Sequence, residues 1–192
     1  MKIALASDHA GFALKEHLKG WLQGEHEITD FGTRSEAACD FSDFAHPAAV
    51  ALAEHRVDRA ILIDGAGYPS AIVANKVHGV YAAVCQDPVC ARLAREHSDT
   101  NALCLGGKLI GPLLAEEIVR VWLTAQPLGG KYAARVAKVR ELESQHLLAR
   151  WQRVRETLTI EDLRRALLEG EDLVIGPHTR VTPSLRDLVN RL

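Results

Sequence analysis

The sequence has almost no excess of charge of either sign, and it has no long stretch free of charged residues. Among its 192 residues, 23 Lys and Arg stand against 25 Asp and Glu, which gives a formal net charge of −2 at pH 7. This balance argues against a protein that binds nucleic acid or a membrane surface, because such proteins carry a basic excess. The longest stretch without Asp, Glu, Lys or Arg, from Gly65 to Asn75, is too short to span a bilayer, which takes about 20 apolar residues.

Motifs of secreted proteins, metal sites and serine hydrolases are also missing. Met1–Asp8 lacks the long apolar core and the cleavage site of a signal peptide. There is no CxxC, HExxH or His-x-His pattern to predict a metal site, and no GxSxG to predict a serine hydrolase. The four cysteines, Cys39, Cys85, Cys90 and Cys104, lie in apolar runs. We expect them to be buried, reduced thiols of a cytoplasmic protein.

What the sequence does have is a regular alternation of short apolar runs and amphipathic segments. The apolar runs predict five strands, at Lys2–Ser7, Ile28–Phe31, Arg59–Asp64, Val80–Cys85 and Ala102–Leu105. The amphipathic segments predict helices at Gly11–Leu22, Phe44–His55, Ser70–Lys76, Pro88–His97 and Gly111–Thr124. Nearly continuous apolar strands are buried on both faces, and their alternation with helices is typical of parallel βαβ units. The sequence therefore predicts an α/β fold of three layers, with helices on both faces of a five-stranded parallel sheet.

A different pattern begins after Gly129-Gly130, where a long helix is predicted at about 131–157. Between Lys131 and Thr157 there are seven basic and three acidic residues. This charge indicates either a solvated helix face or a first turn that offers cations to an anionic ligand. We assign the helix to a first domain, residues 1–157, and residues 158–192 to a C-terminal helical extension.

Capping patterns divide the extension further. Thr159–Asp162 resembles a capping box with Asp in place of the usual Glu, and it is expected to start a helix that ends at Gly170. Leu173–Ile175 is strand-like, and Thr182-Pro183 is expected to cap and start a last helix. We find no internal repeat in the sequence.

Chemically active residues follow three of the predicted strands. Ligands of parallel α/β sheets bind beyond the carboxyl ends of the strands. Those ends are Ser7–Gly11, which contains Asp8 and His9, then Asp64–Tyr68 and Leu105–Lys108. The turn Asp64–Tyr68 places backbone N–H donors beside a carboxylate. This arrangement suits removal of a C–H proton by the carboxylate while the donors hold the developing oxyanion. Because this turn lacks the third glycine and the downstream acid of a dinucleotide fingerprint, no nicotinamide cofactor is expected.

A further candidate, His97, lies at the end of the fourth predicted helix. Histidine titrates near neutrality, so this side chain is able to open a sugar ring by proton transfer. The alternative is a structural role, since a histidine at a helix C-terminus is favoured by the helix dipole.

Seven short segments between Met1 and about Arg140 form an ordered set of motifs. They are Ser7–Phe12, Asp30–Thr33, Asp40–Ala45, Ala74–Gly79, Asp87-Pro88, Arg95–His97 and Gly129-Gly130. Together they resemble the ribose-5-phosphate isomerase B family, which includes the galactose-6-phosphate isomerase subunits. The resemblance implies a Rossmann-like sheet, interconversion of aldose and ketose phosphates through an enediolate, and no metal or organic cofactor. It also implies a homodimer with shared active sites, and it leaves open whether dimers pair into tetramers.

The resemblance implies a role for each candidate residue. One group would surround the sugar: Asp8, His9, Gly65, Ala66, Gly67, Tyr68 and Ser98. A second group would surround the phosphate: His9, Lys108, Lys131 and Arg135. Asp64 stands where the family usually has the cysteine that acts as base, and His97 of one subunit would open the furanose ring.

The catalytic loop departs from the family pattern at several positions. Besides Asp64, Ala66 replaces a threonine and Tyr68-Pro69 replaces a small, glycine-containing pair. Ser70 stands where members without the cysteine have a glutamate. Lysines at two of the three phosphate positions keep the charge but lose the bidentate fork of arginine.

Two functional hypotheses follow from these departures. In the first, Asp64 replaces the cysteine as base in an isomerase of a small sugar phosphate such as ribose 5-phosphate. In the second, the chain is a catalytically altered sugar-phosphate-binding or assembly protein on the same scaffold. The segment Arg180–Asp187 loosely resembles terminal segments of enzymes associated with bacterial microcompartments, which gives an alternative to a purely cytoplasmic location.

Overall fold

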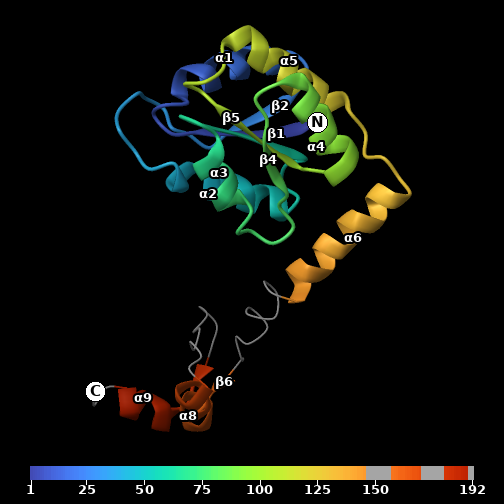
Figure 1. Ribbon diagram of the computed structural model, residues 1–192. Helices are drawn as coiled ribbons and strands as arrows, with labels where there is room; N and C mark the ends of the chain where they lie inside the picture. Colours follow the sequence, from blue (N-terminus) through green and yellow to red (C-terminus); the bar gives the residue numbers. More distant parts are fainter. Residues whose placement is uncertain (146–156, 170–179, 190–192) are drawn as a thin grey trace. The chain divides into compact units, whose positions relative to one another are not determined.

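The computed structural model describes residues 1–145, 157–169 and 180–189 (Figure 1). The chain divides into two compact units, Met1–Arg140 and Glu141–Leu192. This boundary lies within the helix that follows Gly129-Gly130, whereas the sequence predicts a division at 157/158. In the part of the chain that is described, no helix combines the length and the apolar character needed to cross a membrane.

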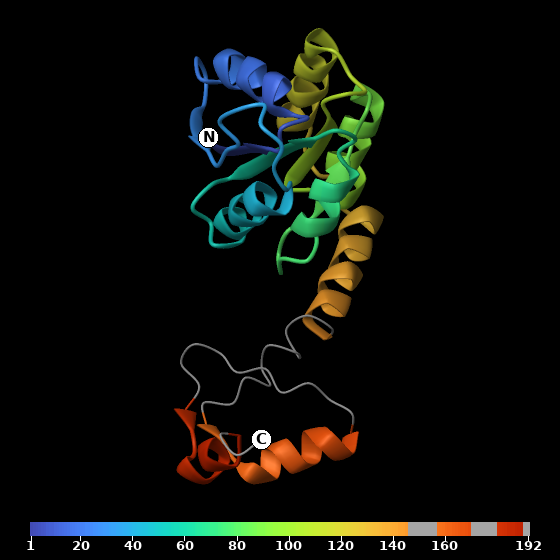
Figure 2. The ribbon, with the colours of Figure 1, turned by 90° about the vertical axis from the view of Figure 1, so that its left-hand side faces the viewer.

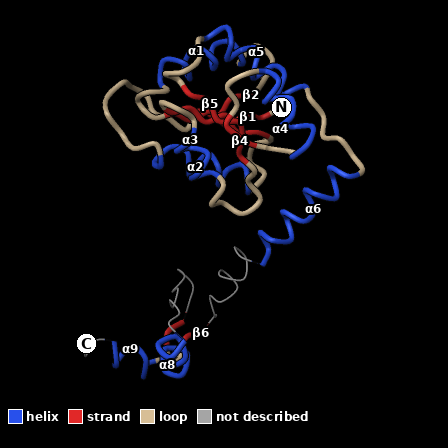
Figure 3. The backbone as a smooth tube through the Cα atoms, viewed as in Figure 1, coloured by secondary structure: helices blue, strands red, loops and turns tan. Residues whose placement is uncertain are grey.

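The first unit has five parallel strands between two layers of helices. The strands are β1 (Lys2–Ser7), β2 (Glu27–Asp30), β3 (Arg59–Asp64), β4 (Ala82–Val84) and β5 (Ala102–Gly106), in the order β2-β1-β3-β5-β4. The helices that alternate with them are α1 (Phe12–Leu22), α2 (Ser42–Ala53), α3 (Tyr68–Ala74), α4 (Pro88–Ser98) and α5 (Pro112–Thr124). Figure 3 shows the strands enclosed between α1 and α5 on one face and α2 and α3 on the other. The predicted three-layer α/β fold is confirmed.

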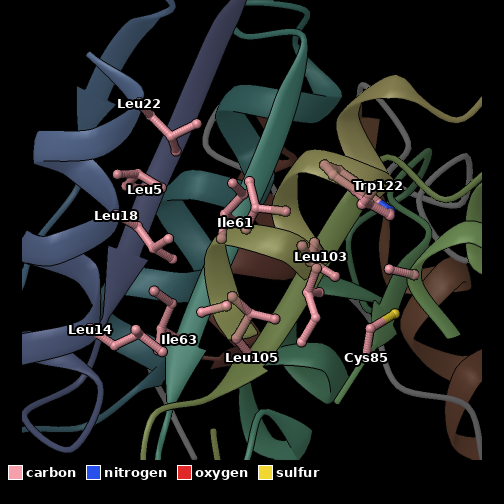
Figure 4. Close-up of a cluster of buried hydrophobic side chains, with 14 of the residues drawn as sticks. Leu5, Leu14, Leu18, Leu22, Ile61, Ile63, Cys85, Leu103, Leu105 and Trp122 are labelled. Carbon is pink, nitrogen blue, oxygen red and sulfur yellow. The ribbon is translucent and has the colours of Figure 1, made fainter. Parts of the chain in front are cut away.

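Alternate side chains of the central strands build the two halves of the core. Ile3 and Leu5 of β1 face a cluster of large side chains from α1 and α5, including Leu18 and Trp122 (Figure 4). Ala4 and Ala6 face the opposite cluster, in which α2 contributes mainly alanine. Small side chains allow α2 to approach the sheet closely, so packing on both faces fixes the register of the strands.

A helix follows Gly129-Gly130, as predicted. It is α6 (Lys131–Glu143), drawn in orange in Figure 2. None of its side chains is buried. Thr157 and Leu158 form strand β6 rather than the end of a helix. The helix predicted at about 131–157 is thus confirmed over Lys131–Glu143, and its remainder at 146–156 lies outside the described part of the chain.

The described part of the second unit contains one small strand–helix motif twice, a repeat that the sequence did not predict. β6 (Thr157–Leu158) leads through Thr159 into α8 (Ile160–Glu169), and β7 (Arg180–Val181) leads through Thr182 into α9 (Pro183–Val189). The two strands pair in parallel. The expected capping box is confirmed, because the Asp162 carboxylate accepts hydrogen bonds from the backbone N–H and the hydroxyl of Thr159, at 3.0 and 2.7 Å. The strand expected at Leu173–Ile175 lies outside the described residues.

All four cysteines are free, but they are not all buried as expected. Cys85 and Cys104 are buried, Cys39 is half-buried and Cys90 is exposed. Cys90 lies in the first turn of α4, where its backbone N–H donates to the capping carboxylate of Asp87. Burial raises the pKa of the Cys85 thiol to about 12, so this thiol stays protonated at neutral pH.

Candidate active site

The carboxyl ends of β1, β3 and β5 meet at one edge of the sheet. The register pairs Ser7 with Ile63 and Asp64 with Gly106, so the turns after these strands lie side by side. Glycine is required where the turns touch. A Cβ at Gly11 would lie 2.4 Å from the Ile63 carbonyl oxygen, and one at Gly107 would lie 2.9 Å from the Gly11 Cα. These contacts make a tight backbone floor below Asp8, Asp64 and Lys108.

The Asp64 side chain turns back onto its own loop. It is 1% exposed. Its Oδ1 accepts hydrogen bonds from the N–H groups of Ala66 and Gly67, at 2.9 and 2.6 Å. Its Oδ2 accepts one from the N–H of Ser70 at 2.9 Å. A carboxylate offers about four lone-pair positions, so Oδ2 keeps one for a further partner.

A second carboxylate and a histidine lie next to this loop. Asp8 is buried, and its Oδ1 accepts a hydrogen bond from the Gly11 N–H at 2.9 Å, which caps the turn into α1. His9 is exposed, and its Nδ1 lies 3.3 Å from the backbone N–H of Cys39. The backbone of Lys108 joins the same edge, because its N–H donates to the Gly65 carbonyl at 3.1 Å. This edge therefore brings acidic, histidine and lysine residues to the loops beside the Gly65–Gly67 turn.

Tyr68 begins α3 directly after Gly67, whose φ of +85° favours glycine. The tyrosine is 54% exposed. Its hydroxyl accepts a hydrogen bond from the Gln86 side-chain amide at 3.3 Å. Gln86 follows β4, so this bond ties the Tyr68 ring to the turn after the neighbouring strand.

His97 belongs to the opposite edge of the sheet. After β4, helix α4 runs back past the sheet, and its C-terminal end precedes β5. Asn101, four residues after His97, bonds through its side chain to the backbone of Gly79 and Tyr81, just before β4. His97 and the exposed Ser98 thus lie at the amino ends of the strands.

The first turns of α6 pack against His97. The rings of His97 and Tyr132 are stacked, with centroids 4.2 Å apart and planes inclined by 10°. Lys131 Nζ lies 5.2 Å and Arg135 Cζ 5.7 Å from the Tyr132 ring centroid. His97, Tyr132 and Arg135 also border a cavity of about 470 Å³ between α6 and the β4 edge. This edge therefore combines an imidazole with two exposed cations.

One chain does not bring all of the predicted site residues together. Asp8, His9, Asp64, the Gly65–Gly67 turn and Lys108 gather at the carboxyl edge. His97, Ser98, Lys131 and Arg135 gather at the amino edge. A strand of five or six residues separates the two edges by about 15–20 Å. No residue of one group can share a small ligand with the other group of the same chain.

Sequence reasoning missed three partners of the candidate residues. Tyr132 on His97, Gln86 on Tyr68 and Cys39 on His9 were not singled out. Tyr132 gave one usable signal, because it lies between Lys131 and Arg135 and so falls near the expected phosphate site. The other two contacts join residues 18 and 30 positions apart through loops, where the sequence has no periodicity to reveal them.

Among the described residues, no group of three or more His, Cys, Asp or Glu side chains is placed to hold a metal ion. The polar groups at the two edges are instead a carboxylate on backbone donors, an exposed and a half-buried imidazole, and separate cations. Such groups can move protons and bind an anion.

Comparison with known proteins decides the family. Residues 3–139 match the family model described as Ribose/Galactose Isomerase. The chain belongs to this family. Ribose-5-phosphate isomerase B of Escherichia coli (strain K12) is 41% identical over 143 residues, which are 74% of this chain and 96% of that protein. D-erythrulose-4-phosphate isomerase of Pectobacterium atrosepticum is 35% identical over 147 residues, which are 76% and 97% of the two chains.

The solved structures agree. Ribose-5-phosphate isomerase B of Clostridium thermocellum superposes with a TM-score of 0.74 at 42% identity and covers 76% of this chain and 99% of its own. The match confirms the Rossmann-like fold and the family that the motifs predicted. The chain is a sugar-phosphate isomerase of the ribose/galactose isomerase family.

Proposed function

We propose that the protein interconverts ribose 5-phosphate and ribulose 5-phosphate through an enediolate, in a homodimer whose active sites each join the carboxyl edge of one chain to the amino edge of its partner. The relative from Escherichia coli bears the name of this activity and aligns with almost its entire length. The location in the cytoplasm is part of the same proposal.

The chemistry requires proton transfer in two separate steps, ring opening and enolisation. His97 takes the proton of the O1 hydroxyl of the furanose and passes it to the ring oxygen as the bond from C1 to that oxygen breaks, which opens the ring. Asp64 Oδ2 then takes the proton from C2, and the electrons of that bond form the enediolate. Asp64 returns the proton to C1, and the proton of the C2 hydroxyl moves to O1, which completes the ketose, so the product is an isomer without any added reactant.

The division of the site residues supports the shared active site. The carboxylate proposed as base and the imidazole proposed for ring opening lie at opposite edges of one sheet, about 15–20 Å apart. A two-fold axis that sets the amino edge of one chain over the carboxyl edge of the other would complete two identical sites at once. The lack of buried side chains on α6 fits a helix that packs on another chain.

The observation that carries the role of Asp64 is its geometry. Three backbone N–H groups fix the carboxylate beside the Gly65–Gly67 turn and leave a lone pair of Oδ2 for a proton. Burial excludes water, which strengthens the interaction of the carboxylate with any proton donor that enters.

The same geometry favours a second candidate, a protein that binds sugar phosphates but enolises them slowly. The Ala66 and Gly67 N–H groups, which the resemblance assigns to the enediolate, are bound to Asp64 instead. Loss of one oxyanion donor typically lowers the rate about 100- to 1000-fold.

Hydrogen exchange distinguishes the two candidates. In D2O with ribose 5-phosphate, the wild-type protein should incorporate deuterium as it forms the enediolate. Asp64→Asn should lower the exchange rate about 10²- to 10⁴-fold, the usual contribution of a general base. Asp64→Cys should retain exchange that rises toward alkaline pH, because a free thiol titrates near about 8.5.

Two other results would change the assignment. Exchange by Asp64→Asn at the wild-type rate would show that this carboxylate only anchors the loop. If none of a panel of pentose, tetrose and hexose phosphates exchanges hydrogen while several raise the melting temperature, the binding protein is the correct description.

A further inference from the structure

We propose that Tyr132 is a positioning residue for ring opening: its ring fixes the plane of the His97 imidazole and holds it in one array with the cations Lys131 and Arg135. This inference rests on the proposed function and names a residue that the motifs of the sequence did not assign.

The stack constrains His97 where its helix does not. His97 lies in the last turn of α4 and is half-buried, so packing within its own helix leaves the ring free to rotate. The Tyr132 ring lies parallel to it, with the centroids 4.2 Å apart. Two parallel rings in contact cannot rotate independently about their side-chain bonds, so the two imidazole nitrogens keep a fixed direction. Ring opening needs that direction, since one group must reach both O1 and the ring oxygen of the sugar.

Both cations lie close to the same Tyr132 ring. Lys131 and Arg135 lie four residues apart on α6 and so share a face, and both approach the Tyr132 ring within 6 Å. A phosphate held by this pair therefore lies at a fixed offset from the imidazole. Tyr132 sets that offset, because it contacts His97 and both cations.

A contact in the last turn of α6 holds this helix against the end of α4. Arg140 donates to the Asp99 carboxylate at 3.1 Å, and Asp99 also accepts from the buried Arg95 at 2.9 Å. Asp99 follows directly after α4, so this link joins the two helices beside the stack. The link from Arg140 through Asp99 to Arg95 thus fixes α6 relative to α4, and with it the position of the Tyr132 ring relative to His97.

The test separates ring opening from enolisation by the choice of substrate. Ribose 5-phosphate is a furanose and must be opened, whereas ribulose 5-phosphate is acyclic, because its 5-hydroxyl is esterified. Conversion of ribose 5-phosphate therefore reports both steps. Exchange of the C1 hydrogen of ribulose 5-phosphate in D2O reports enolisation alone. Both rates are measured for the full-length wild-type protein and for Tyr132→Leu, Tyr132→Phe and Val139→Ala.

Tyr132→Leu should lower the kcat for conversion of ribose 5-phosphate about 10- to 100-fold, the effect of a misplacement of about 1 Å. Its C1 exchange with ribulose 5-phosphate should stay within about threefold of the wild type, since enolisation does not use the imidazole. Tyr132→Phe keeps the stacked ring and should rescue conversion. Val139→Ala alters the same cavity wall without touching the stack, and both rates should resemble those of the wild type.

Three results would overturn the inference. Tyr132→Leu with unchanged conversion would show that the stack has no role. Equal loss of conversion and exchange would show that Tyr132 supports binding or folding in general. Wild-type protein that neither converts ribose 5-phosphate nor exchanges ribulose 5-phosphate would refute the proposed function itself, and with it a ring-opening role for Tyr132.

Discussion

Restoration of activity by mixing two inactive variants tests the shared active site directly. Asp64→Asn damages the carboxyl edge, and His97→Ala damages the amino edge of the same chain. In a mixed dimer, one site receives both damaged edges, and the other joins the intact carboxyl edge of one chain to the intact amino edge of its partner. The structure therefore predicts that two inactive preparations become active when their subunits are exchanged.

The size of the recovery follows from the symmetry. Random exchange of equal amounts gives mixed dimers as half of the population, and each has one intact site of two, so the mixture should reach about a quarter of the wild-type activity. The assay is conversion of ribose 5-phosphate after co-expression or after dissociation and refolding. Circular dichroism of each variant checks that both are folded.

A second pair of variants provides the control. His97→Ala and Lys131→Ala both damage the amino edge, so every site in their mixed dimer contains one damaged edge. This mixture should recover nothing. If the first mixture also stays inactive although mixed dimers form, or if both mixtures recover alike, the two edges do not form one site across the dimer.

Two further predictions concern acid stability and substrate size. Burial by itself raises the pKa of Asp30, but hydrogen bonds from Lys19, Lys15 and the Gly32 N–H outweigh this effect and hold the pKa below its ordinary value of 3.8. A carboxyl with a lowered pKa stabilises the folded state above its unfolded pKa, and this stability is lost as the pH falls through the folded pKa. Asp30→Asn leaves the Glu16 carboxylate to balance the fully buried Lys15 side chain and should cost about 1.5–3 kcal/mol near pH 7. Urea unfolding should show that the difference in free energy of unfolding between the variant and the wild type becomes smaller below about pH 4. A difference that does not change with pH would contradict this role. Tyr68→Ala removes an exposed ring tied to Gln86 beside the catalytic turn and should raise kcat/KM for hexose 6-phosphates relative to ribose 5-phosphate; an unchanged ratio in competition assays would show that the ring does not limit substrate length.

Much of the fold follows from the sequence because burial leaves a direct pattern. The structure confirms the predicted bounds of Lys2–Ser7 and Arg59–Asp64. A strand that is buried on both faces appears in the sequence as a nearly continuous apolar run, so its limits can be read directly. The fourth strand was predicted at Val80–Cys85 but is formed only by Ala82–Val84. This strand is at the edge of the sheet, its residues are only half-buried, and a side chain, that of Asn75, bonds to the backbone of Ala82. Fewer buried side chains make the limits of an edge strand harder to predict.

The sequence by itself determined the α/β alternation, the capping of the extension and the family motifs, because these depend on residue types at fixed short spacings. Only the tertiary structure decided that the Asp64 carboxylate bends back onto the N–H groups of its own loop and that Tyr132 covers His97. Both features depend on the directions in which side chains point once the chain has folded. Those directions are set by strand register and helix packing, which join residues far apart in the chain and leave no periodic trace in it.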